Sequence, residues 1–69
     1  MKRFELAIEA ELRLTTKEIE ILRSNARTWV VRAEVFHQDG DDDRATQALV
    51  FATAFSEVAD KRQEELLAR

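Results

Sequence analysis

The sequence predicts an all-α fold, a small three-helix up-down bundle that takes in the whole chain, residues 1–69, as a single domain. Proline is absent and glycine occurs once, so little in the chain interrupts a helix. Ala, Leu, Glu and Arg are abundant, and apolar residues recur at steps of three and four. A chain of this length buries only about 60% of its unfolded surface, so its core must be efficient or shared with a partner.

A short first helix is expected over about residues 3–13. The residues that share its apolar face are Phe4, Ala7, Ile8 and Leu12. Directly after it, Thr15 and Glu18 have the spacing of a capping box, in which the two side chains bond free amides at the start of a helix. A second helix is therefore predicted to begin at this point.

The second helix is expected over about residues 16–38. Its apolar residues alternate in steps of three and four, the spacing that keeps one seam of a helix against a partner: Ile19, Leu22, Ala26, Trp29, Ala33 and Phe36. A second, weaker stripe lies about half a turn away and consists of Ile21, Thr28, Val31 and Val35. Because a helix with two apolar faces has two neighbours, these four residues are interface candidates.

The third helix is expected over about residues 42–67, and the short connection before it predicts an antiparallel hairpin with the second. Four alanines on its apolar arc allow two backbones to approach closely: Ala45, Ala48, Ala52 and Ala59. Four aromatic residues are expected to fill the space between the helices as a structural seam: Trp29, Phe36, Phe51 and Phe55. Arg62 falls in the same arc, where we expect it to pair with an acid of another helix.

The turn between the long helices has the sequence FHQDGDDDRA, residues 36–45. Gly40 is the one residue there that takes the left-handed conformation after a helix at no steric cost. Asp41 or Asp42 can then accept the first free amides of the next helix as its N-cap, and Asp43 suits the positive end of the helix dipole. The turn is therefore predicted to be a helix-hairpin corner.

The same turn matches a calcium loop only in part. Asp39, Asp41 and Asp43 alternate as the first ligands of an EF-hand do. The sixth and twelfth places of such a loop require Gly and Glu, and here they are Arg44 and Val50. No metal ligand is therefore assigned, and no cofactor is expected.

The charge balance argues against nucleic-acid binding. The net charge is −3 and the pI is about 5.1, whereas a phosphate-binding face needs concentrated positive charge. The arginines that could still serve such a role are Arg23, Arg27 and Arg32. Cysteine is absent, so neither a disulfide framework nor a thiolate metal site is expected. Acids interrupt the apolar residues near the start, so neither a membrane segment nor a signal peptide is expected. We expect a cytoplasmic protein.

The segment AEVFHQDGDDDRATQALVFATAFSEVAD, residues 33–60, combines a helix-end aromatic, a Gly-Asp turn, an Arg-Ala step and an aromatic-Ala-x-small-aromatic run before an acid. These features are carried by Phe36, Gly40, Asp41, Arg44, Ala45, Phe51, Ala52, Ala54, Phe55 and Glu57. The segment resembles the second half of an archaeal family of small helical proteins, domain of unknown function 357. It departs from the family in its extra acids and its ending, DKRQEELLAR. The resemblance implies three up-down helices with a long hairpin, and it implies no activity.

Two functions follow as expectations. The first is a non-enzymatic helical interaction module that forms a homo-oligomer or serves as a small subunit of a larger complex. The first helix is too short to cover both the two stripes of the second helix and the wide apolar arc of the third, and surplus apolar surface usually marks an interface. The alternative is a small metal-binding protein or enzyme that uses Glu34, His37 and the Asp39–Asp43 cluster; Glu34 and His37 match, once, the Glu-x-x-His spacing of di-metal bundles. Catalysis would need a second polar group beside His37, and the sequence identifies none. No catalytic residue is therefore assigned.

Overall fold

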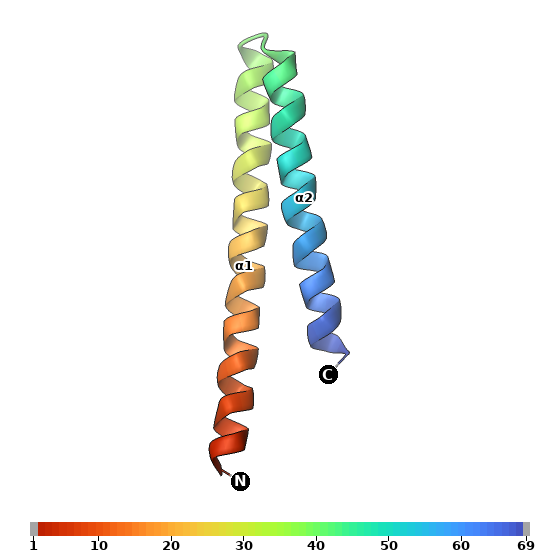
Figure 1. Cartoon of the computed structure of the whole chain (residues 1–69). Helices are drawn as coiled ribbons and strands as arrows, with labels where there is room; N and C mark the ends of the chain where they lie inside the picture. Colours follow the sequence, from red (N-terminus) through yellow and green to blue (C-terminus); the bar gives the residue numbers. More distant parts are fainter. Residues whose placement is uncertain (1, 69) are drawn as a thin grey trace.

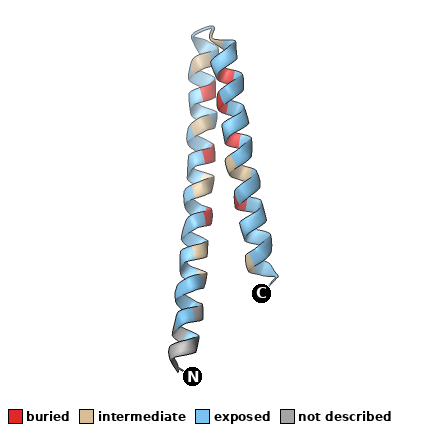
Figure 2. Cartoon of the chain, viewed as in Figure 1, coloured by how far each residue is buried: buried red, intermediate tan, exposed pale blue. Residues whose placement is uncertain are grey.

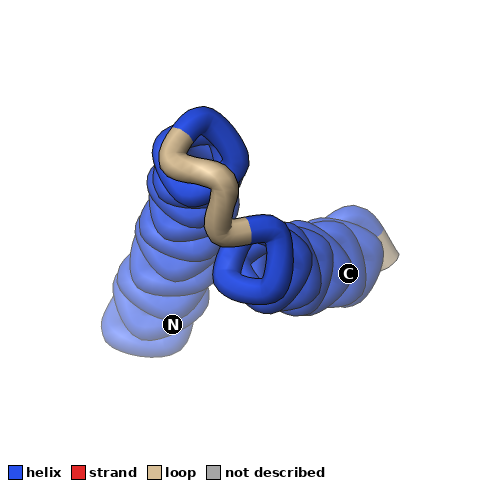
Figure 3. Tube along the Cα trace, turned by 90° about the horizontal axis from the view of Figure 1, so that it is seen from above, coloured by secondary structure: helices blue, strands red, loops and turns tan. Residues whose placement is uncertain are grey.

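The computed structural model describes residues 2–68, with the side chains of residues 5, 7 and 9–68, and this part of the chain forms a helical hairpin (Figure 1). Helix α1 spans Lys2–Gln38 and helix α2 spans Asp42–Leu67. The two helices run antiparallel, and their axes diverge away from the turn that joins them (Figures 1 and 3). The all-α class and the long hairpin are confirmed.

The hairpin is a single layer of two helices. Its extents are 59 × 16 × 11 Å, and its radius of gyration is 16.5 Å, whereas a globular domain of this length has about 11 Å. At 1.5 Å per residue, α1 is about 55 Å long and α2 about 39 Å. The N-terminal end of α1 therefore projects beyond the last residue of α2, as Figure 1 shows.

The prediction of three helices is wrong, because α1 continues through the expected break. The Thr15 hydroxyl donates to the carbonyl of Glu11 and the Thr16 hydroxyl to that of Leu12, both at 2.9 Å. Both hydroxyls are thus bonded within the helix. A capping box requires its first residue to leave the helical conformation, and no Gly or Pro forces that here. The expected first helix, residues 3–13, is the start of α1.

The expected apolar face of that first segment is described only in part. The side chains of Phe4 and Ile8 lie outside the described residues. Leu12 is half-buried, and Ala7 is exposed.

The interior of the hairpin consists almost entirely of alanine. Figure 2 shows the buried positions along the facing sides of the two helices. They are Ile19, Ala26, Ala33, Ala45, Ala48, Ala52 and Ala59. Because a methyl group is the largest side chain at most of these positions, the two backbones can approach closely and leave little volume between them.

The aromatic residues do not fill the space between the helices as predicted. Trp29, Phe36 and Phe55 are half-buried, and Phe51 is 49% exposed. They lie along the edge of the alanine seam, since closely approaching backbones leave no room for a ring between them. The Trp29 and Phe51 rings meet there, with centroids 4.9 Å apart and planes tilted by 42°.

Cross-helix contacts define how the helices are aligned. Trp29 meets Phe51, and Arg62 Nη1 donates to Glu18 Oε2 at 2.7 Å, so the residue numbers that face each other add up to about 80. The expected pairing of Arg62 with an acid of the other helix is confirmed. Both side chains of this pair are about half exposed, so it stabilises the hairpin by no more than about 1 kcal/mol.

The turn has the predicted corner geometry. Gly40 has φ of 79°, in the left-handed region. The Asp41 amide donates to the Phe36 carbonyl at 2.8 Å, and the Gly40 amide to the His37 carbonyl at 3.0 Å, which together form a Schellman motif. Asp41 is the N-cap of α2, since its carboxylate accepts the Arg44 amide at 3.2 Å. Asp42 lies in the first turn of α2.

We expect Gly40→Val to destabilise the hairpin by about 1 kcal/mol or more, because a β-branched residue is strained at positive φ. A side chain at this position would contact nothing within 4 Å, so the cost is purely conformational. The expected loss corresponds to a fall of several degrees in Tm. Gly40→Asn is the matched control and should lose less, since Asn tolerates this conformation. An unchanged Tm for Gly40→Val would contradict the assignment.

Replacing Thr15 with Ala distinguishes a continuous helix from a capped one. In a continuous helix, alanine is favoured by up to about 0.7 kcal/mol, so Thr15→Ala should match or exceed the parent in stability. At an N-cap the same change would cost about 1 kcal/mol. Thr28→Ala is the control, because the Thr28 hydroxyl also donates four residues back, to Ser24 at 3.1 Å. Thermal unfolding followed by circular dichroism should move both variants in the same direction.

Candidate protein interface

Large apolar side chains remain exposed along both helices. A two-helix layer gives each helix one neighbour, so only one side of each is covered. The exposed large apolar residues are Leu14, Ile21, Val30, Val31, Val35, Leu49, Val50, Phe51, Val58 and Leu67. Some of them, such as Val50 on α2 and Val31 on α1, line hollows formed by one helix alone, so the uncovered apolar surface includes the outer sides of both helices.

One broad face, here called the aromatic face, contains Val58 together with four aromatic residues: Trp29, Phe36, Phe51 and Phe55. Cross-helix contacts place both helices on this face: the Phe51 ring contacts Trp29, and the Arg44 guanidinium lies 6.0 Å from the centre of the Phe36 ring. At 100° per residue, Val58 follows Phe51 on nearly the same line of α2. Arg32 also covers part of this face, with its guanidinium carbon 4.7 Å from the centre of the Trp29 ring.

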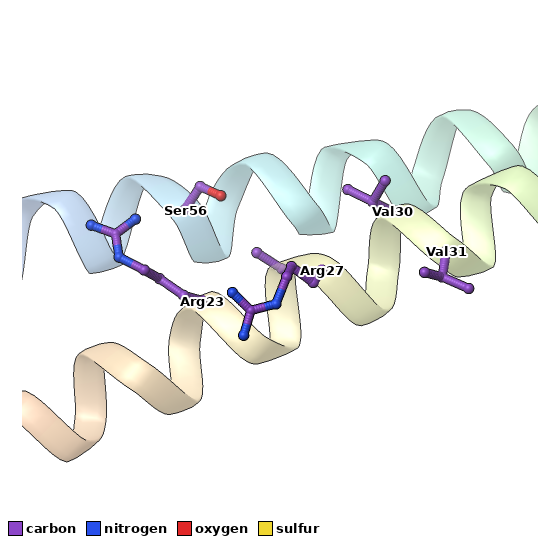
Figure 4. Close-up of a pocket in the computed structure, with 6 residues that line it drawn as sticks. Arg23, Arg27, Val30, Val31 and Ser56 are labelled. Carbon is purple, nitrogen blue, oxygen red and sulfur yellow. The ribbon is translucent and has the colours of Figure 1, made fainter.

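The other broad face, here called the groove face, contains two open hollows between the helices. The first, of about 420 Å³, is lined by Arg23, Ala26, Arg27, Val30, Val31 and Ser56. Figure 4 shows the α1 residues of this hollow with Ser56 across from them on α2. The second, of about 460 Å³, is lined by Val30, Ala33, Glu34, His37, Asp42, Ala45, Thr46 and Leu49. Polar side chains thus surround a small apolar centre.

The four interface candidates are all exposed on α1: Ile21, Thr28, Val31 and Val35. At 100° per residue they share one side of α1, about half a turn from the buried seam. Thr28 and Val31 line one hollow on this side, and Val31 also lines the first hollow of the groove face. Their role as an interface stays a prediction.

The acidic turn and His37 form no compact ligand set. His37 Nδ1 lies 3.1 Å from Asp42 Oδ1, and Glu34 lines the same hollow. Asp41 is engaged as the N-cap. Among the described residues, no three His, Asp or Glu side chains come together in an arrangement that could hold a metal ion. The arrangement places one histidine against one carboxylate at an exposed helix end.

The three arginines considered for nucleic acid make different contacts. Arg23 donates to Asp60 at 3.1 Å and to Gln63 across the hairpin. Arg27 lines the hollow beside Arg23, and it lines another hollow together with Arg32, whose guanidinium lies over the Trp29 ring. As for membranes, neither α1 nor α2, over the described residues, has a stretch apolar and long enough to cross one.

Sequence reasoning missed one arrangement on the aromatic face. It expected Phe51 to lie between the helices with the alanines, whereas the alanines face α1 and the side chains of Phe51 and Val58 are exposed. The pattern that could have revealed this arrangement is a set of residues spaced seven apart with a charged residue at each end: Arg44, Phe51, Val58 and Glu65. A strict step of seven marks one line of a helix, and this line flanks the seam.

No protein-family model matches the chain, and comparisons with curated proteins and with solved structures find no significant similarity to any of them. The resemblance of residues 33–60 to domain of unknown function 357 therefore stays a prediction.

Proposed function

We propose that this chain is a non-enzymatic helical interaction module, which acts as a homo-oligomer or as a small subunit of a larger helical complex. The observation that carries the proposal is the surface area of the hairpin. It exposes 5825 Å², whereas a compact protein of 8.0 kDa exposes about 4,450 Å². An excess of about 1,400 Å² is more than one partner usually contributes to a standard protein interface.

The composition of the exposed surface supports the same conclusion. Aromatic side chains are enriched at the centres of protein interfaces, and the hairpin leaves four of them at most half-buried: Trp29, Phe36, Phe51 and Phe55. The N-terminal part of α1 projects past α2 and receives no packing from it (Figure 1). A short helical segment without tertiary packing is marginal in water, so a partner that extends along α1 would stabilise it.

The chemistry of the hairpin supports binding over catalysis. Catalytic groups are usually held together where water is partly excluded. No polar or charged side chain among the described residues is buried, and the hollows of the groove face are open. The proposal includes a cytoplasmic setting, which rests on the sequence expectation.

Light scattering on a gel-filtration column tests the proposal. A homo-oligomer should elute with a mass of about 16 kDa or a higher multiple of the 8.0 kDa chain. A subunit that lacks its partner should instead elute as a monomer that binds the dye ANS on its exposed apolar surface. The same column run in denaturant gives the monomer reference. A monomer that binds no ANS would overturn the proposal.

Calorimetric titration with Ca²⁺, Mn²⁺ and Zn²⁺ separates this proposal from the metal-binding alternative. We expect no saturable heat, because His37 meets a single carboxylate and Asp41 is engaged as the N-cap. His37→Ala is the matched control and should give the same trace as the parent. Saturable binding that His37→Ala abolishes would favour the alternative that uses Glu34, His37 and the Asp39–Asp43 cluster.

A further inference from the structure

We propose that the aromatic face binds a second copy of this chain face to face, with the two turns at opposite ends, to form an antiparallel four-helix bundle. The inference rests on the proposed function and deepens it, since it assigns both the surface and the partner. Three observations carry it: the apolar content of the face, the order of charges along it, and the area that it can bury.

The aromatic face presents rings from both helices. It contains Trp29, Phe36, Phe51, Phe55 and Val58. The groove face contains aliphatic side chains, among them Val30 and Leu49, together with the Arg23 pairing. Because aromatic side chains are enriched at the centres of protein interfaces, the aromatic face is the better candidate.

Between residues 18 and 32, the charges along one line of α1 invert about one residue. Glu18, Asn25 and Arg32 follow each other at steps of seven, so they lie on one line of the helix. Glu18 bonds Arg62 across the hairpin, and Arg32 covers Trp29, which places both ends of this line at the aromatic face. A rotation by 180° about an axis perpendicular to the helix at Asn25 exchanges the positions of Glu18 and Arg32.

On α2, the order of charges along one line also inverts, about a point level with Asn25 of α1 along the length of the hairpin. Arg44, Phe51, Val58 and Glu65 form one line, whose midpoint lies beside residue 55. The facing residues of the hairpin have numbers that add up to about 80, so residue 55 lies level with Asn25. One two-fold axis therefore serves both helices, because both patterns invert at the same level.

The axis passes between the two copies, perpendicular to the helices. It places Arg32 of one copy beside Glu18 of the second copy, and Arg44 beside Glu65. Phe51 of one copy then lies beside Val58 of the other. The arrangement with both turns at the same end forms neither charge pair, because it sets α1 of one copy against α2 of the other.

The available area fits a stable dimer. The hairpin exposes about 1,400 Å² more than a compact protein of its mass. A standard interface takes about 800 Å² from each partner, so burial of little more than half of this excess is enough. The interface is isologous, with the same patch used by both copies.

Single cysteines test the axis directly, because the chain contains no cysteine of its own. Helix axes in a bundle are about 8–10 Å apart, and Cα atoms lie about 2.3 Å from each axis. Two copies of residue 25 on facing lines then have Cα atoms about 5 Å apart, a distance that a disulfide spans. We expect Asn25→Cys to form a covalent dimer on mild oxidation, read on a non-reducing gel. Circular dichroism should confirm unchanged helicity.

Ser56→Cys is the matched control, since Ser56 lies at nearly the same height on the groove face. It should stay monomeric on the same gel. Cross-linking of Ser56→Cys, alone or together with Asn25→Cys, would overturn the assignment of the face. If neither variant cross-links, the assignment of the aromatic face as the dimer interface is wrong. An oligomeric mass in light scattering would then leave the proposed function standing, and an ANS-negative monomer would remove both.

A charge exchange tests the direction of the pairing. Arg44→Glu should weaken self-association by about 2- to 30-fold, because two rim pairs are lost in each dimer. Arg44→Glu combined with Glu65→Arg should restore it, as measured by sedimentation at several concentrations. The exchange does not rebuild the contacts of Arg44 with Asp41 and Phe36, so recovery cannot come from within one hairpin. Failure of the double variant to recover would overturn the antiparallel arrangement.

Discussion

The close contact of two helices across alanine side chains is the constraint on which the rest of this structure depends. Ala48 and Ala59 are 1% and 0% exposed, so no larger side chain fits where they lie. A thin interior has a small apolar volume, and it displaces the rings of Trp29, Phe36, Phe51 and Phe55 to the edge of the seam. The hairpin therefore combines a small interior with an apolar exterior. This combination explains why so small a chain can form two long helices and still leave much apolar surface uncovered.

The sequence predicted the parts of the fold that depend on local chemistry and periodicity. The seam of α1, the alanines of α2 and the role of Gly40 follow from steps of three and four and from backbone sterics. The break at Thr15 was predicted wrongly, because the capping-box spacing is a local pattern that also fits inside a continuous helix, where the hydroxyl bonds Glu11 instead. The positions of the aromatic rings could not be predicted, since periodicity gives a direction around each helix but no distance between two backbones.

The candidate interface follows only from the sequence and the structure taken together. The charge order on each helix is present in the sequence, but its meaning depends on the alignment of α1 with α2. That alignment is defined by cross-helix contacts, such as those of Trp29 with Phe51 and of Arg62 with Glu18. The acidic turn shows the reverse relation: its residues attract attention in the sequence, yet they serve to end one helix and begin the next. A concentration of charge is therefore a weaker guide to binding than the position of charge relative to an apolar face.

The place of Trp29 gives the chain an internal optical reporter. It is the only tryptophan, and its ring lies at the rim of the hairpin between Arg32 and Phe51. An indole at such a rim exchanges water for protein when another molecule covers it, and its emission is sensitive to that exchange. The unmodified chain can therefore report occupancy of its aromatic face through intrinsic fluorescence, with no dye attached.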